Sequence, residues 1–98
     1  MMMQIETTQD FVDWLSGLTD PIARKRIAKH LARAEAGNLG NWKALKGVQG
    51  IFEMRIDHGP GYRLYFARRG QTIIVLLGGG TKQDQTAAIA VANRLWNG

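Results

Sequence analysis

Cationic and aromatic side chains gather in one short stretch, RIDHGPGYRLYFARR, between residues 55 and 69. This stretch holds four arginines, two tyrosines and a histidine around a Gly-Pro-Gly turn. Guanidinium groups bind phosphate through two parallel hydrogen bonds, and aromatic rings stack on nucleobases. These residue types therefore favour contact with a nucleic acid, provided that the fold displays them on one surface.

The spacing within and just before this stretch indicates a β-hairpin. Residues 51–57 and residues 62–68 each alternate apolar with polar side chains, and the loop HGPG joins them. Because side chains two positions apart share a face of a strand, an in-register hairpin collects four of them opposite its apolar side: Glu53, Arg55, Arg63 and Tyr65. We expect a rigid surface that grips a phosphate and stacks a base. The alternative is a solvated strand face on which Glu53 forms ion pairs with Arg55 or Arg63.

Other residues are weaker candidates for chemistry. Lys82 follows the glycines of LLGGGTKQ without the Walker spacing, and we expect those glycines to bring it towards the hairpin face. His58 could exchange protons near neutral pH or be a plain turn residue. Trp42, beside Lys43 and Lys46, could line a groove or pack in the core. With two histidines, no cysteine and scattered carboxylates, the sequence predicts no metal site.

Helical patterns precede the hairpin. Thr7 and Asp10 have capping-box spacing at the start of a first apolar stripe. Asp20 and Pro21 predict the start of a second helix, from about residue 21 to 36, and the short connection predicts an antiparallel helical hairpin. The cations of the second helix are expected on a solvated face: Arg24, Lys25, Lys29 and Arg33.

Two further elements follow the hairpin and one precedes the helices. The apolar run TIIVLLGGG predicts a strand covered on both faces, and therefore central in the sheet. A third helix is predicted in TKQDQTAAIAVANRLWNG. Its apolar stripe is expected to contain Ala88, Val91, Ala92 and Leu95. The opening MMMQIE has the weakest pattern and is compatible with a short strand.

Composition sets the class of protein. The 98 residues are enough for one domain, which we expect to cover residues 1–98. A formal net charge of +5 favours a polyanionic partner. No apolar run is long enough for a membrane helix, and the N-terminus lacks the pattern of a signal peptide. With no cysteine, the chain is expected in the cytoplasm.

The chain resembles toxins of the RelE/ParE superfamily, most closely the HigB-like branch of phage-derived or addiction-module killer proteins. The resemblance rests on DPIARKRI, GNLGNWK, E-x-R-x-D-x-GPGYR-x-YF and LLGGG-x-K-x-x-Q, and it spans nearly the whole chain. It implies an α+β fold in which two N-terminal helices and a C-terminal helix pack on a small, mostly antiparallel sheet. It also implies a type II toxin–antitoxin pair, in which the toxin cleaves mRNA, usually on the ribosome, and a helix-turn-helix antitoxin neutralises it.

The resemblance assigns roles in RNA cleavage that needs no metal or other cofactor, in which the 2′-hydroxyl attacks the adjacent phosphorus. Arg55 and Arg63 match the basic sheet residues that contact the scissile phosphate, and Lys82 matches a basic residue just before the last helix. Lys43 and Lys46 match basic positions in the preceding segment. These five residues are the expected RNA contacts.

The resemblance does not identify the general acid and the general base of the cleavage reaction. Glu53 stands where RelE has a lysine, and it could be the base or pair with Arg55. The tyrosine or histidine that several relatives carry after the last strand is missing from QDQTAA. Tyr65, His58 or Lys82 would then substitute, or the ribosome would complete the site, or nuclease activity is weak or altered.

Two other functions remain open: a non-enzymatic ParE-like inhibitor of gyrase or another target, and a degenerate toxin that only binds its antitoxin. If the protein is an RNA-cleaving toxin, Arg63→Ala is expected to abolish growth arrest and to leave folding and antitoxin binding largely intact.

Overall fold

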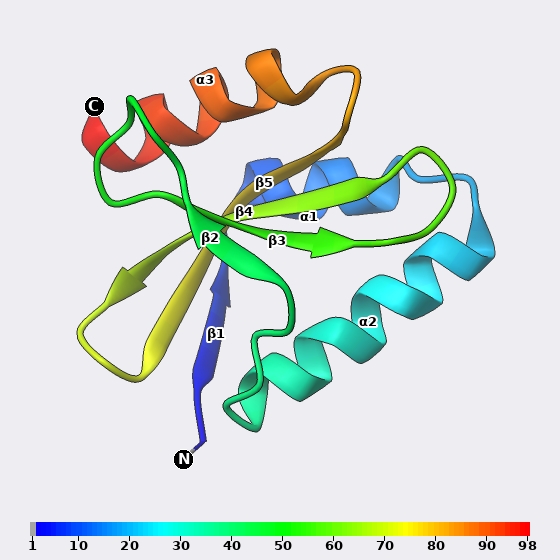
Figure 1. Cartoon of the computed structure of the whole chain (residues 1–98), viewed down its shortest axis with the longest axis horizontal. Coiled ribbons are helices and arrows are strands. Elements are labelled where there is room, and N and C mark those ends of the chain that lie inside the picture. Colours follow the sequence, from blue (N-terminus) through cyan, green and yellow to red (C-terminus); the bar gives the residue numbers. More distant parts are fainter. Residues whose placement is uncertain (1) are drawn as a thin grey trace.

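A computed structural model describes residues 2–98 of the chain (Figure 1). The elements are β1 (Gln4–Thr7), α1 (Gln9–Ser16), α2 (Pro21–Glu35), β2 (Trp42–Ala44), β3 (Phe52–Ile56), β4 (Tyr62–Arg69), β5 (Ile73–Thr81) and α3 (Gln85–Asn97). The five strands form one sheet in the order β1-β5-β4-β3-β2, in which only β1 and β5 run parallel. This arrangement confirms the predicted α+β fold. The short strand β2 was not predicted.

Helices cover both faces of the sheet, so the chain has two apolar clusters. On one face, Phe11 of α1 and Ile27 of α2 pack with Leu64, Phe66 and other side chains of the sheet. On the other face, Ala92 of α3 packs with sheet side chains that include Tyr65 and Leu77. The strand β5 supplies buried side chains to both clusters, which confirms that it is covered on both faces.

The two N-terminal helices do not form the predicted helical hairpin. Helix α1 packs mainly on β5, whereas α2 lies against β1 and β3 (Figure 1). The short connection between the helices therefore turns the chain across the sheet instead of folding one helix along the other. One consequence is that α2 lies beside β3 and near the hairpin that carries the candidate site.

The caps of the helices explain where they begin. Asp20 accepts hydrogen bonds from the backbone of Ile22 and Ala23, which confirms the predicted start of α2. The prediction for α1 was wrong by one residue, because Thr8 accepts the bond from the Phe11 amide while Thr7 belongs to β1. Pairing with β5 holds Thr7 in the sheet and leaves the next threonine as the cap.

The ends of the chain differ in part from the predictions. The strand predicted in the opening residues exists as β1; Met1 lies outside the described residues. On α3, Ala88, Ile89, Ala92 and Trp96 pack against the sheet, whereas Leu95 is exposed, so the apolar stripe is shifted from the predicted one. Among residues 2–98, no helix combines the length and apolar character that a membrane span requires.

The glycine run continues β5 to Thr81 and permits close packing. A Cβ at Gly79 would lie 2.4 Å from the ring of Trp14, which packs against this position. A Cβ at Gly80 would lie 2.7 Å from Oδ1 of Asp84, the group that accepts a hydrogen bond from the Thr81 amide. These glycines thus let α1 and the start of α3 approach the end of β5, just before Lys82.

Candidate functional site

The hairpin of β3 and β4 pairs in the predicted register. Glu53 lies opposite Tyr65, and Arg55 lies opposite Arg63. Their side chains therefore share one face of the sheet, because Met54 and Leu64, the alternate residues, belong to the cluster beneath α1 and α2. The predicted collection of two arginines on one face is confirmed.

Three cations meet around a hollow at the end of this face. The hollow has a volume of about 210 Å³, and its lining includes Arg55, Arg63 and Lys82. The carbonyl of Gly61 accepts a hydrogen bond from the Lys82 amide at 3.1 Å and one from Nη1 of Arg63 at 3.5 Å. The hairpin turn thus ties the end of β5 to Arg63, and Lys82 lies beside the hairpin as expected. We call this space the phosphate hollow.

Glu53 lies between the two arginines. Its Oε2 is 3.6 Å from Nε of Arg63, and its Oε1 is 4.0 Å from Nε of Arg55. Its side chain is only 4% exposed, and among residues 2–98 no donor forms a hydrogen bond to its Oε2. The ion pairs foreseen as an alternative are therefore present, and Glu53 is placed to orient guanidinium groups.

Arg63 is less exposed than the sequence suggested. Its side chain is 9% exposed, against 44% for Arg55. The expectation that Arg63 lies outside the core was wrong, because the flanking strands and Glu53 enclose it. A substitution of Arg63 must therefore affect the fold as well as the site.

Tyr65 is not displayed at all, which corrects a second expectation. Its ring is fully buried in the cluster beneath α3. Burial, together with the nearby Glu53 carboxylate, raises the pKa of Tyr65 to about 12. The phenol is thus neutral at physiological pH and is not free to stack on a base.

The other predicted residues lie outside the lining of the phosphate hollow. His58 places its Nε2 3.0 Å from Oδ2 of Asp20 and stacks on Tyr62, so it joins the hairpin turn to the start of α2. This contact lowers the pKa of the Asp20 carboxyl below its usual range. Lys43 is exposed opposite Glu53 on β2, on the same face, and Lys46 is exposed in the following loop.

Sequence reasoning missed two features, one at the hollow and one on the neighbouring helix α2. The Gly61 carbonyl, which holds both Lys82 and Arg63, carries no side-chain signal. The cations of α2 were treated as a solvated face, although their spacing already placed several on one side of the helix. Among residues 2–98, no three His, Cys, Asp or Glu side chains are grouped as metal ligands.

The fold has a known counterpart. A mutant of E. coli toxin RelE, solved in the free state, superimposes with a TM-score of 0.66 over 92% of this chain and 97% of that chain, at 14% sequence identity. The match confirms the RelE-like fold that the sequence predicted.

The family is defined by sequence. Residues 13–96 match the family described as "Phage derived protein Gp49-like (DUF891)". An uncharacterized protein of Haemophilus influenzae (strain Rd) is 40% identical over 95 residues, which cover 97% of this chain and 94% of that protein. The chain belongs to the phage-derived Gp49-like family. The finer assignment to a HigB-like branch stays a prediction.

Proposed function

We propose that this protein is the toxin of a toxin–antitoxin pair and that it inhibits translation by cleaving RNA without a metal, on the ribosome in the cytoplasm. The observation that carries the proposal is the convergence of Arg55, Arg63 and Lys82 on one hollow about 210 Å³ in volume. Family membership and the RelE-like fold support the toxin assignment, and an antitoxin of helix-turn-helix type is the expected partner.

The hollow suits the charge that develops during the reaction. The RNA 2′-hydroxyl loses its proton to solvent and attacks the adjacent phosphorus, which forms a 2′,3′-cyclic phosphate as the bond to the 5′-oxygen breaks. The phosphoryl oxygens gain negative charge on the way, and preorganised cations stabilise that charge most strongly. Arg55 and Arg63 supply these cations from adjacent strands, and Glu53 forms ion pairs with their Nε groups. The arginines act as electrostatic stabilisers, and Glu53 acts as a positioning residue.

Lys82 is assigned the protonation of the departing 5′-oxygen. Of the candidates for proton transfer, Tyr65 and Glu53 are buried and His58 is held by Asp20. Lys82 is exposed and lines the hollow. An ammonium group there can approach a leaving oxygen and donate a proton to it.

Mapping of transcript 5′ ends after induction in cells tests the proposal. We expect new ends at codon-linked positions, and we expect Lys82→Gln to lower their yield by about 10²-fold, the usual cost of losing one group at a charged transition state. Arg69→Gln is the matched control, because Arg69 is on β4 but pairs with Glu6 at the far end of the strand. Intact messages together with gyrase-linked DNA breaks would overturn the proposal in favour of a gyrase inhibitor.

A further inference from the structure

A second and larger hollow lies between α2 and β3. Its volume is about 510 Å³, and its charged lining is almost entirely cationic. The charged residues of this lining are Lys25, Arg26, Lys29, Arg33, Arg55 and Asp57. We call this space the α2 groove.

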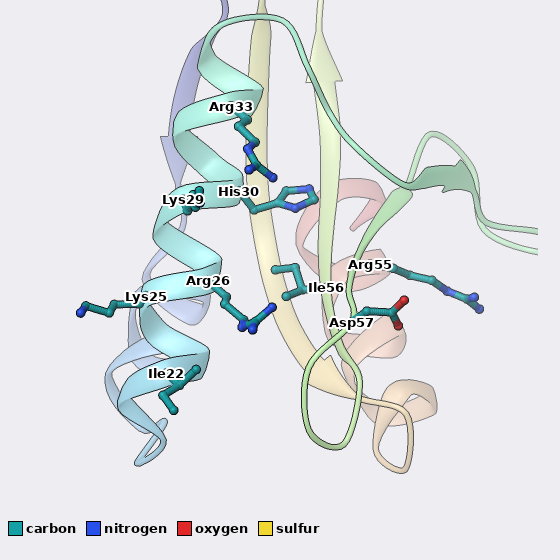
Figure 2. Close-up of a pocket in the computed structure, with 9 residues that line it drawn as sticks. All are labelled: Ile22, Lys25, Arg26, Lys29, His30, Arg33, Arg55, Ile56 and Asp57. Carbon is teal, nitrogen blue, oxygen red and sulfur yellow. The ribbon is translucent and has the colours of Figure 1, made fainter.

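The spacing of residues along α2 explains why the side chains that it contributes to the groove lie on one side of the helix. Residues 22, 26, 29 and 33 recur every three or four positions, so they form one face of α2. Figure 2 shows the Arg26 side chain pointing from the helix towards β3 and the Arg33 side chain running towards His30, with Ile56 and His30 between the two arginines. Nε2 of His30 lies 3.0 Å from the carbonyl oxygen of Leu39, which ties the middle of α2 to the following loop.

The cations of the groove are available to a ligand. Lys25, Arg26, Lys29 and Arg33 are all exposed. The ion pairs found among residues 2–98 include none of these four side chains. Four like charges on one helix repel each other, so a bound polyanion would relieve an unfavourable arrangement.

The groove and the phosphate hollow share a wall. Arg55, Ile56 and Asp57 line both spaces. In Figure 2 the Arg55 side chain points away from α2, so β3 has the groove on one side and this guanidinium on the other. Ladder pairing with β2 ends at Met54, and the Arg55 amide then donates a hydrogen bond to the Asn41 carbonyl; among residues 2–98 no strand pairs with residues 55–57 on this side.

We propose that the α2 groove binds the sugar-phosphate backbone of the same RNA strand that enters the phosphate hollow, several nucleotides from the cleaved bond. This inference rests on the proposed function and adds a second contact region to it. Regularly spaced phosphates match regularly spaced long cationic side chains, and such contacts do not depend on sequence.

The lining favours RNA over an acidic polypeptide. An amphipathic helix that docks in a groove uses several apolar anchors, whereas this lining offers only Ile22 and Ile56 as large apolar residues. Continuity with the phosphate hollow also favours one extended polyanion that occupies both spaces.

Binding of single-stranded RNA of two lengths tests the inference. The probe is fluorescein-labelled 2′-O-methyl RNA, which lacks the attacking hydroxyl and stays intact; one form has about 3 nucleotides and the other about 12. Each phosphate contact to a single strand contributes about 0.7 to the slope of log Kd against log salt concentration. For the long RNA, Arg26→Gln/Arg33→Gln should lower that slope by about 1.4. For the short RNA, the slope should not change.

A matched variant separates the groove from general electrostatics. Arg24→Gln/Arg94→Gln also removes two exposed charges, but neither residue lines the groove. The inference is overturned if this variant weakens long-RNA binding as much as the groove variant does. It is also overturned if the groove binds a labelled oligo-glutamate peptide as tightly as the long RNA.

Failure of this inference is distinguishable from failure of the proposed function. If the groove variant binds long RNA like the wild type while the wild type still cleaves transcripts, only the inference is wrong. If Lys82→Gln leaves cleavage intact while the groove variant loses long-RNA binding, the assignment of Lys82 as the acid is wrong and RNA binding by the groove stands.

Discussion

Arg63 and Glu53 lie on adjacent strands, and their side chains are only 9% and 4% exposed. Removing one member of such a pair leaves the other charge in a poorly solvated place, which commonly costs more than the pair itself contributes. We predict that Arg63→Gln lowers the free energy of unfolding by about 3 kcal/mol. Chemical denaturation of the purified chain measures this loss.

The double variant Glu53→Gln/Arg63→Gln identifies the cause. It removes both charges, and we expect it to recover at least half of the lost stability while RNA cleavage stays impaired. A double variant as unstable as the sum of the two single variants would show that the charges do not interact. Growth arrest alone is therefore a poor test of Arg63, because an unstable toxin also fails to arrest growth.

Tyr65 provides a pH-dependent measure of its burial. Its pKa rises from 10.0 to about 12, so the folded state holds the phenol proton more tightly than the unfolded state does. This difference contributes to the free energy of unfolding, and the contribution is fully present below pH 10. It is lost, by about 3 kcal/mol, as the pH rises towards 12. We predict that Tyr65→Phe unfolds at a higher pH than the wild type in alkaline titrations followed by circular dichroism.

The same substitution should be nearly neutral at pH 7. Among residues 2–98, the Tyr65 hydroxyl has no hydrogen-bond partner, so its removal also removes a buried unsatisfied group. Equal alkaline midpoints for the two proteins would contradict the buried, neutral phenol.

At the scale of elements, α1 depends on the missing side chain at Gly79. A Cβ there would lie 2.4 Å from the Trp14 ring, so the helix would have to move away from β5. We predict that Gly79→Ala lowers the free energy of unfolding by about 2 kcal/mol, as overpacked cores commonly do. The matched control is Gly78→Ala, whose Cβ meets no atom within 4 Å. Thermal unfolding of both variants measures the difference, and equal losses would contradict the close packing of Trp14.

The elements that the sequence predicted well are those with a local signal. The alternation in residues 52–56 and 62–66 defined the hairpin and its register, and Asp20 with Pro21 defined the start of α2. By contrast, β2 has only three residues and exists through its pairing with β3. The packing of α3 could not be predicted either. Trp96 packs on the sheet through contacts with residues that are distant in sequence, and a local pattern does not report such contacts.

The candidate site was predictable to the same extent. Alternation placed Arg55 and Arg63 on one face, but it could not show which part of that face α3 covers. Tyr65 is therefore buried although its position in the pattern matches that of Arg63. The α2 groove arises from the angle between a helix and a strand edge, which no local pattern specifies.

At the scale of the whole molecule, the net charge of +5 acts over distances longer than any contact. The chain extends over 33 × 30 × 22 Å, while the screening length is about 10 Å at 0.1 M salt and about 3 Å at 1 M. At low salt the field therefore reaches past the surface and steers an approaching RNA, and at high salt it does not. We predict that the association rate constant for the long RNA falls by at least about 10-fold between these two salt concentrations. Stopped-flow fluorescence measures this rate.

The two double variants separate the field of the molecule from the local contacts. Arg26→Gln/Arg33→Gln and Arg24→Gln/Arg94→Gln each reduce the net charge by two, so both should slow association at low salt by similar factors. Only the first removes side chains of the α2 groove, so only the first should also speed dissociation. Because long-range steering sets the rate of encounter and short-range contacts set the lifetime of the complex, a groove variant that changed association alone would place the RNA elsewhere on this basic surface.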